Sequence, residues 1–316
     1  MSAPTWIGGE EVRERVSPDR ARRLLEQAIL DGFDPAGDPP RAAPRTEHGQ
    51  LLVMPSTTAT AAGVKVASVA PDNPARGLER IQALYVLMDA ETLTPSVLMD
   101  GTSLTALRTP AVSALGLDRL APAEVTSAVI VGNGPQAVTH AEALLAIRDV
   151  RRLTVAGRDQ ERVAGAAERI AAQAREAGAE IEVDVVVGRA DLEAVVREAQ
   201  VVVCVTSAAE PVIDGAWVAD GAAVVAVGSH ETDRRELDAQ LMGRALVVVE
   251  DIATALREAG DVVMAIAEGA LAESDLVPLR DLVRDEVTRA DDRPNVFKTV
   301  GMSWEDLVIA EGAAHP

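Results

Sequence analysis

The chain of 316 residues contains one cysteine, two lysines and few aromatic side chains, which make up 2% of its residues. Cys204 cannot form a disulfide within the chain, and in the stretch VVVCVTS it is expected to pack as a small hydrophobic side chain. The scarcity of aromatic residues argues against a surface on which nucleic-acid bases stack. The four histidines lie far apart, and no CxxC, HxH or HExxH spacing occurs, so the sequence predicts no metal site.

Long apolar runs and an excess of positive charge are also missing. No segment approaches the roughly 20 consecutive apolar residues that a membrane-spanning helix needs. The first residues, MSAPTWIGGEEVRERV, lack the basic and apolar regions of a secretory signal. The formal net charge of −20 would repel a polyanion. We therefore expect neither nucleic acid nor a membrane as a partner, and a cytoplasmic location.

From about residue 127 onward, apolar runs of strand length alternate with amphipathic stretches of helix length. The runs begin at Ala128, Arg152, Ile181, Gln200, Ala222 and Ala245. They are rich in β-branched residues and uncharged at their centres, as expected for strands that are covered on both faces. The alternation is typical of βαβ units, so the predicted fold class is α/β with a doubly wound, Rossmann-type parallel sheet.

The first 120 residues predict a second, α+β domain. The stretch SPDRARRLLEQAIL is expected to be a helix, with Ser17 as its N-cap and Pro18 at its first position. A turn rich in proline and glycine follows, and then the short strand-like runs QLLVMPS, GVKVASVA and ALYVLMDAETLTPSVLMDG. Within the last run, DAET is expected to form a turn between two paired strands.

A glycine-rich sequence, VGNGPQAVTHAEALL, follows the first of the six predicted strands. Gly132, Gly134 and Ala137 fit the G-x-G-x-x-G/A pattern. In this pattern the first glycine allows a tight turn, the second lets the backbone approach a pyrophosphate, and the alanine permits close packing of the next helix. Because it lies between a strand and a helix, the pattern predicts dinucleotide binding rather than a merely structural turn.

The end of the next predicted strand, TVAGRDQER, bears on the choice of cofactor. Arg158 could bind the additional phosphate of NADP, whereas an acid at this place would accept a hydrogen bond from the free 2′-hydroxyl of NAD. Asp159 follows immediately, and Arg158 could instead stack on the adenine of either cofactor. We expect NADP(H) to be preferred, with NAD(H) as the alternative.

Lysine is rare enough that its two positions are informative. Of the thirty basic residues, only Lys65 and Lys298 are lysines. Arginine stays charged, whereas a lysine can lose its proton when it is desolvated or surrounded by other cations. Lys65 is therefore a candidate proton donor, the alternative being a solvated lysine on a strand.

Seven short sequence motifs, spread over nearly the whole chain, match the motifs of one protein family. They are LLVMP (51–55), GVKV around Lys65, MDGTSLTALRTPAVSALG (99–116), VGNGPQA, VTSAAEPVI (205–213), VGSHETDRRELD (227–238) and VFKTVGMSWEDLVIA (296–310). Together they resemble the ornithine cyclodeaminase/mu-crystallin family. The resemblance implies a homodimeric NAD(P)-dependent enzyme that acts at the α-carbon of an amino or imino acid.

The resemblance also implies how the chain is divided. Residues 1–117 together with 298–316 are expected to form a domain for substrate binding and dimerisation, built from both chain ends. Residues 118–297 are expected to form the NAD(P)-binding domain.

Position by position, the resemblance assigns residues to the substrate site. Lys65 and Arg108 match the family's substrate-site lysine and arginine. Arg41 suits the spacing of a further arginine that helps to bind the substrate carboxylate, with Arg45 as the second choice, and Val300 is a further substrate contact. With two arginines beside it, Lys65 is expected to have a lowered pKa and to give a proton to an imine nitrogen. The expected cofactor contacts are Gly132, Asn133, Gly134, Pro135, Gln136, Ala137, Arg158, Thr206, Val227, Lys298 and Thr299.

The chain departs from the family pattern at VGSH. Cyclodeaminase members have an aspartate here that handles the substrate amines, whereas this chain has His230, either a second catalytic residue that transfers protons or a loop residue near the cofactor. We therefore expect an NAD(P)H-dependent reductase of α-imino acids, or the reverse amino-acid dehydrogenase. The alternatives are an ornithine or lysine cyclodeaminase and a non-catalytic protein that binds NADP and a small ligand.

Overall fold

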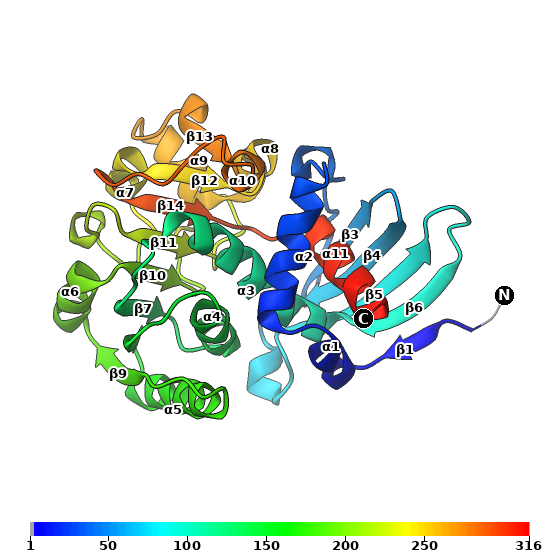
Figure 1. The fold of residues 1–316 in the computed structure, drawn as a ribbon, viewed down its shortest axis with the longest axis horizontal. Helices are drawn as coiled ribbons and strands as arrows, with labels where there is room; N and C mark the ends of the chain where they lie inside the picture. The colour runs from blue at the N-terminus through cyan, green and yellow to red at the C-terminus, as the bar shows by residue number, and fades with distance from the viewer. Residues whose placement is uncertain (1–2, 316) are drawn as a thin grey trace. The chain divides into compact units, whose positions relative to one another are not determined.

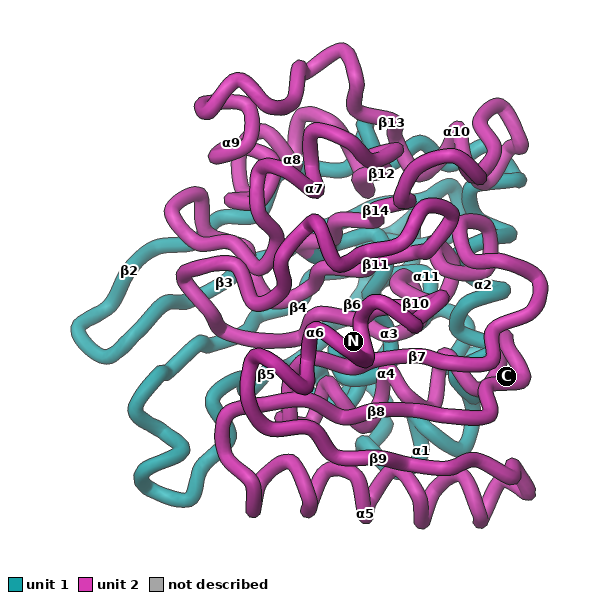
Figure 2. The backbone as a smooth tube through the Cα atoms, turned by 90° about the vertical axis from the view of Figure 1, so that its left-hand side faces the viewer, with its two compact units in different colours: residues 1–109, 301–316 teal, residues 110–300 magenta. Residues whose placement is uncertain are grey.

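The structure, a computed structural model, describes residues 3–315 and divides into two compact units. Unit 1 comprises the described parts of Met1–Thr109 and Gly301–Pro316, and unit 2 comprises Pro110–Val300 (Figure 2). From the sequence, the two divisions were expected after residues 117 and 297. The first division lies inside helix α3 (Gly101–Leu120) at Pro110, where the missing N–H removes one hydrogen bond of the helix.

Unit 2 is built on an eight-stranded parallel sheet, sheet B, with the strand order β13-β12-β14-β11-β10-β7-β8-β9, which Figure 2 shows from top to bottom. The strands are β7 (Ser127–Val131), β8 (Arg152–Gly157), β9 (Glu182–Val187), β10 (Val201–Cys204), β11 (Ala223–Ala226), β12 (Leu246–Val249), β13 (Leu276–Pro278) and β14 (Asn295–Lys298). The α/β class with a parallel, Rossmann-type sheet is confirmed, and β7 to β12 correspond to the six predicted strands.

Strands β13 and β14 were not predicted. β14 is only four residues long, and it lies inside the sheet, where Val296 pairs with Val224 of β11 and with Val247 of β12. In the sequence its apolar run is only Val296 and Phe297, whereas the equally short β10, β11 and β12 lie within longer apolar runs. The last strand along the chain therefore completes the middle of sheet B, which local sequence patterns do not reveal.

Helices connect the strands of sheet B. They are α4 (Pro135–Leu145), α5 (Gln160–Glu176), α6 (Arg189–Glu198), α7 (Ala239–Arg244), α8 (Ile252–Glu258), α9 (Gly260–Ala267) and α10 (Leu279–Val283), with short 3-10 turns at η3 (Gly215–Trp217) and η4 (Glu273–Asp275). Strands β10, β11, β12 and β14 are buried at every position, as expected for a sheet covered on both faces. Within residues 3–315, each helix is too short or too polar to cross a lipid bilayer.

Unit 1 contains a mixed six-stranded sheet, sheet A, with the order β1-β6-β5-β4-β3-β2. Its strands are β1 (Thr5–Ile7), β2 (Arg45–Thr46), β3 (Gly49–Thr57), β4 (Ala61–Val69), β5 (Ile81–Asp89) and β6 (Pro95–Asp100). Its helices are α1 (Gly9–Arg15), α2 (Pro18–Leu30) and α11 (Ser303–Ala314), with 3-10 turns at η1 (Pro35–Gly37) and η2 (Asn73–Arg76). The C-terminal helix α11 packs on β3, β4, β5 and α2 (Figure 1), so both chain ends build this unit.

Gly63 on β4 allows Tyr85 of β5 to pack on the inner face of sheet A. Tyr85 is fully buried, and a Cβ atom at position 63 would lie 2.2 Å from its hydroxyl oxygen. Gly63→Ala should therefore force the ring out of place and lower the free energy of unfolding by about 1–3 kcal/mol, measured by denaturant unfolding.

The matched control is Gly165→Ala on α5, where a Cβ atom would meet nothing within 4 Å. Because alanine has a higher helix propensity than glycine, this variant should be more stable than the wild type by up to about 1 kcal/mol. Wild-type stability in Gly63→Ala would contradict the packing described for Tyr85.

Candidate active site

The loop between β7 and α4 has the backbone geometry of a dinucleotide-binding turn. Gly132 has a φ of +134°, and a Cβ atom there would lie 2.7 Å from the carbonyl oxygen of Val205, so a side chain does not fit. At Gly134 a Cβ atom would meet nothing within 4 Å, which leaves open space beside the backbone. Ala137 is fully buried and allows close packing of α4.

The N-terminus of α4 is suited to an anion. Within the described part of the chain no side chain caps the helix, and Pro135 occupies its first turn, so backbone N–H groups of this turn have no side-chain partner there. Asn133 packs near Gly157 at the end of β8, where a Cβ atom would lie 3.0 Å from its Nδ2. These features fit the diphosphate of a dinucleotide.

The structure separates the roles of Arg158 and Asp159 at the end of β8. The Oδ1 atom of Asp159 accepts hydrogen bonds from the backbone N–H groups of Glu161 and Arg162, both at 3.1 Å, and caps α5. The Asp159 carboxylate is thus used as the N-cap of α5, while the Arg158 side chain is exposed to solvent. This arrangement favours Arg158 over Asp159 as the residue that would contact the 2′-substituted ribose of a dinucleotide.

A buried carboxylate, Glu236, joins the loops that follow β10 and β11. Its Oε1 accepts from the backbone N–H and the hydroxyl of Thr206 at 2.6 and 2.7 Å. Its Oε2 accepts from the N–H groups of Val227 and Gly228 at 3.1 and 2.7 Å. Burial raises the pKa of Glu236, and the nearby Lys298 opposes this shift. Two expected cofactor contacts, Thr206 and Val227, are therefore held together by one side chain that the sequence analysis missed.

Lys298 is fully buried at the end of β14. Its Nζ donates to the carbonyl oxygens of Ser229 at 2.6 Å and Ala226 at 3.3 Å and lies 3.1 Å from Oδ2 of Asp261. Because two carbonyl oxygens accept from the ammonium and a carboxylate balances its charge, the arrangement favours a structural role over direct contact with a cofactor. Asp261 Oδ1 in turn accepts from the N–H of Glu236 at 2.7 Å, so Lys298, Asp261 and Glu236 form one network.

The remaining predicted residues of unit 2 lie next to this network. His230 is half-buried in the loop after β11 and directly follows Ser229. Thr299 is buried, and its N–H donates to the carbonyl oxygen of Ala226. Val300 is half-buried, and its N–H donates to Oε2 of Glu250 at 2.7 Å.

In unit 1, Lys65 points from β4 to the face of sheet A that α11 covers. Its Nζ lies 2.6 Å from Oδ2 of Asp306 and donates to the hydroxyl of Thr105 at 3.2 Å. Burial lowers the pKa of Lys65 to about 8; Asp306 opposes this shift, and Arg108 adds to it. A lowered pKa of Lys65 was expected from neighbouring arginines, whereas burial is the larger cause.

Arg108 and Arg41 both contact the segment before α11. Nη1 of Arg108 lies 2.7 Å from Oε2 of Glu305, and a Cβ atom at Gly301 would lie 2.1 Å from that nitrogen. Gly301 also has a φ of +79°, so glycine is required here. Nη1 of Arg41 donates to the carbonyl oxygen of Gly301 at 3.4 Å, whereas Arg45 is exposed on β2. This geometry favours Arg41 over Arg45 as the partner of Arg108.

Asp38 attaches the loop that carries Arg41 to α11. Its Oδ1 accepts from the hydroxyl of Ser56 at 2.6 Å, and its Oδ2 accepts from the N–H of Trp304 at 3.0 Å. Burial raises the pKa of Asp38 to about 6. Asp38 and the two acids of α11 were not singled out from the sequence. The signal that could have revealed the latter is the pair of adjacent acids in the otherwise apolar stretch SWEDLVIA.

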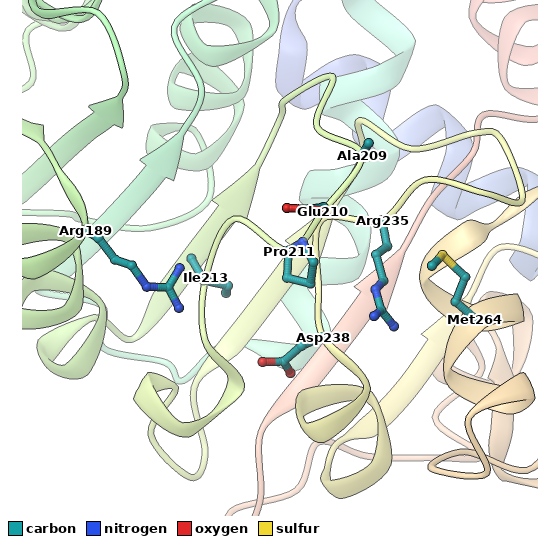
Figure 3. A pocket seen from close by; sticks show the side chains of 8 residues that line it. All are labelled: Arg189, Ala209, Glu210, Pro211, Ile213, Arg235, Asp238 and Met264. Atoms are coloured by element: carbon teal, nitrogen blue, oxygen red, sulfur yellow. The ribbon is translucent and has the colours of Figure 1, made fainter.

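A separate cavity of about 620 Å³ lies within unit 2 (Figure 3). Its lining residues follow β9, β10 and β11 or belong to α9, and they are Arg189, Ala209, Glu210, Pro211, Ile213, Arg235, Asp238 and Met264. None of them was predicted as a site residue. The two arginines already have partners, because Arg189 stacks 4.6 Å above Trp217 and Arg235 pairs with Glu268. Within residues 3–315, no cluster of His, Cys, Asp and Glu side chains could hold a metal ion.

Comparison with known proteins gives consistent matches along the chain. The family model described as "Ornithine cyclodeaminase/mu-crystallin family" matches residues 11–313. The Delta(1)-pyrroline-2-carboxylate reductase 2 of Burkholderia ambifaria is 35% identical over 265 residues, covering 84% of this chain and 80% of that protein. The ketimine reductase mu-crystallin of Mus musculus is 31% identical over 318 residues, covering 98% and 96%. The structure of Thermococcus litoralis Delta(1)-pyrroline-2-carboxylate reductase in complex with NADH and L-proline has a TM-score of 0.90 at 28% identity, covering 98% of this chain and 96% of that chain.

The role of Lys298 can be tested by Lys298→Met, which removes the ammonium but keeps an apolar stem. Because Asp261 would be left buried without its cation, we expect the free energy of unfolding to fall by about 3–5 kcal/mol in denaturant unfolding. The matched control is Arg152→Met, which breaks the exposed pair of Arg152 and Glu198 and should cost less than about 1 kcal/mol. Weaker NADPH binding with unchanged stability in Lys298→Met would instead indicate direct cofactor contact.

Proposed function

Because the chain belongs to the ornithine cyclodeaminase/mu-crystallin family, we propose that it is an NAD(P)H-dependent reductase of α-imino acids. The reverse reaction would make it an amino-acid dehydrogenase. Relatives named as reductases of pyrroline-2-carboxylate and of ketimines support an oxidoreductase that acts on C=N bonds. The observation that carries the proposal is the buried Lys65, which has a lowered pKa and lies in a cluster with Arg108.

Arg108 and Arg41 would bind the substrate carboxylate. A guanidinium presents two parallel N–H donors to a carboxylate, which fixes the orientation of the bound acid as well as adding affinity. Arg108 suits this role because Glu305 holds its guanidinium in place. Val300 would supply an apolar contact to the same substrate.

Lys65 would protonate the imine nitrogen. With a pKa of about 8, its ammonium is mostly charged at neutral pH and gives up its proton at a modest cost. Bound NADPH or NADH would supply the hydride to the α-carbon. The C=N bond thereby becomes a CH–NH unit: the carbon gains the hydride, and the nitrogen gains the proton that Lys65 loses.

Residues of unit 2 would hold the dinucleotide. The turn Gly132–Ala137 would bind the diphosphate, including the Asn133, Pro135 and Gln136 positions, and Arg158 would bind the 2′-phosphate of NADPH, the preferred cofactor. Thr206, Val227 and Thr299 would contact the cofactor along the carboxyl ends of the strands.

We also propose that the protein is a homodimer, assembled through the outer face of sheet A. Apolar side chains on this face remain partly exposed, including Leu51 at 37%, Val66 at 38% and Leu84 at 39%. The outward positions of β3, β4 and β5 carry no charged residue from Leu51 to Pro55, from Val64 to Ser68 or from Gln82 to Met88. Two copies of a strongly acidic chain would repel one another least through such an uncharged face.

His230 disfavours cyclodeamination. That reaction must deprotonate a distal ammonium before it attacks the imine, and an anion nearby assists this step. A histidine supplies no negative charge and, when protonated, would repel the ammonium. An imino acid with a neutral side chain has no such requirement, and there His230 could take part in proton transfer.

The proposed reaction can be tested by the oxidation of NADPH and NADH with cyclic imino acids, a pyrroline and a piperideine carboxylate. We expect consumption of the reduced cofactor and no release of ammonia from ornithine or lysine. Lys65→Arg should lower kcat by about 100-fold or more, because arginine keeps the charge but cannot release a proton. NADPH binding to this variant should be unchanged. Ammonia from ornithine without net cofactor change, or full activity of Lys65→Arg, would refute the proposal.

The preference for NADPH can be tested with Arg158→Ala. Loss of a charged hydrogen bond should weaken NADPH binding by about 1.5–3 kcal/mol and leave NADH binding unchanged, as measured by titration calorimetry. Arg162→Ala, which removes another exposed arginine of the same region, serves as the control and should change neither affinity. Equal losses for both cofactors in Arg158→Ala would mean that Arg158 stacks on the adenine.

A further inference from the structure

We infer that Asp306 is a positioning residue for Lys65: its buried carboxylate holds the ammonium in the place and charge state from which it donates its proton, and so fixes the upper pH limit of the reaction. The inference rests on the proposed role of Lys65 as the proton donor. It adds a residue from the C-terminal helix, far from Lys65 in sequence, to the apparatus that moves the proton.

The contacts of Lys65 leave one direction for a substrate. Its Nζ is 2.6 Å from Oδ2 of Asp306 and 3.2 Å from the hydroxyl of Thr105. The Thr105 hydroxyl donates its own proton to the carbonyl oxygen of Gly101 at 2.7 Å, so it can only accept from Lys65. These two acceptors occupy two of the three N–H donors of the ammonium. The third N–H remains for an imine nitrogen.

A buried carboxylate with a purely structural role normally has both oxygens hydrogen-bonded, and Asp306 does not. Its side chain is fully buried, yet its Oδ1 atom has no hydrogen-bond partner among the described residues and lies 3.6 Å from Nε of Arg108. Tyr85 pairs with Lys65 across β4 and β5, and its buried hydroxyl likewise has no hydrogen-bond partner within residues 3–315. Buried polar atoms in folded proteins are normally hydrogen-bonded, so these atoms indicate a place where a polar ligand atom completes the site.

The charged side chains around Lys65 come from two helices, because its strand neighbours Met54 on β3 and Tyr85 on β5 are uncharged. Helix α11 contributes Asp306 and Glu305, and α3 contributes Arg108. Two cations and two carboxylates thus face one another in a buried cluster. Arg108 pairs chiefly with Glu305, which leaves Asp306 as the counter-ion of Lys65.

The other titratable groups near this cluster cannot replace Asp306. Tyr85 on β5 stays neutral, because burial and nearby carboxylates, including Asp306 and Glu311, raise its pKa well above its ordinary value. Asp38, whose pKa is raised to about 6, is engaged by Ser56 and by the backbone of α11. Burial lowers the pKa of Lys65, and Asp306 provides the largest opposing influence. Without the Asp306 charge, Lys65 would lose its proton at a lower pH. A smaller fraction of Lys65 would then be protonated and able to act as the proton donor at neutral pH.

Asp306→Asn and Glu305→Gln form a matched pair for testing this inference. The two acids are adjacent, fully buried and paired to different cations. We would measure kcat and KM for reduction of a cyclic imino acid across the pH range, with NADPH affinity as the check on unit 2. In the wild type, kcat/KM should fall above a pH of about 8, because Lys65 must be protonated. In Asp306→Asn this fall should move to lower pH by about one unit or more.

Glu305→Gln should behave differently. Because its partner is Arg108, we expect a higher KM for the imino acid and the same upper pH limit as the wild type. An unchanged pH limit in Asp306→Asn, or an equal shift in both variants, would overturn the inference.

Asp306→Asn could fail to fold, and the wild type could prove inactive with imino acids. If Asp306→Asn does not fold, Asp306→Glu retains the charge in a displaced position and should keep the wild-type pH limit with a lower kcat; a lowered limit in this variant would contradict the inference. If the wild type oxidises neither NADPH nor NADH with any imino acid, the proposed function itself fails, and this inference falls with it. An active wild type with an unmoved pH limit would refute the role of Asp306 alone.

Discussion

The buried ion pairs at the first turn of α11 are the constraint on which unit 1 depends. Asp306 binds Lys65 of β4, Glu305 binds Arg108 of α3, and Asp38 binds the backbone of the same turn. A buried charge that loses its partner destabilises a protein by several kcal/mol, so these elements must be assembled together. The contacts that hold the C-terminal helix on sheet A are therefore the same contacts that orient the proposed substrate-binding side chains.

Unit 2 contains a second buried network, and the two networks explain the two lysines of an otherwise arginine-based chain. Lys298 bonds to two backbone carbonyls and to Asp261, and Lys65 bonds to Asp306 and Thr105. In both places a compact ammonium meets acceptors from different directions, which the planar fork of arginine does not match. Lys298 stabilises the loops beside the expected cofactor contacts, whereas Lys65 keeps one donor for chemistry.

Local sequence was sufficient for the features that are contiguous in the chain. Six strands of sheet B could be predicted because they lie in stretches rich in β-branched residues that alternate with helical patterns, and the glycine turn could be predicted because strand, turn and helix follow one another. β14 could not be predicted, because its four residues become a strand only between β11 and β12. The partner of Lys65 was equally hidden: Asp306 lies 241 residues further along the chain, and only the packing of α11 brings it to β4. Burial, the main cause of the lowered pKa of Lys65, also depends on that packing.

The pKa of Lys65 tests the account most directly, and the small number of lysines makes it measurable. Protein labelled with a heavy carbon isotope at Cε of lysine should give two lysine signals by NMR, which Lys65→Arg assigns. The account predicts that the Lys65 signal titrates with a pKa of about 8 rather than the ordinary value of 10.5. A Lys65 signal that titrates at about 10 or above, as for a solvated lysine, would contradict the buried proton donor on which the proposed reaction depends.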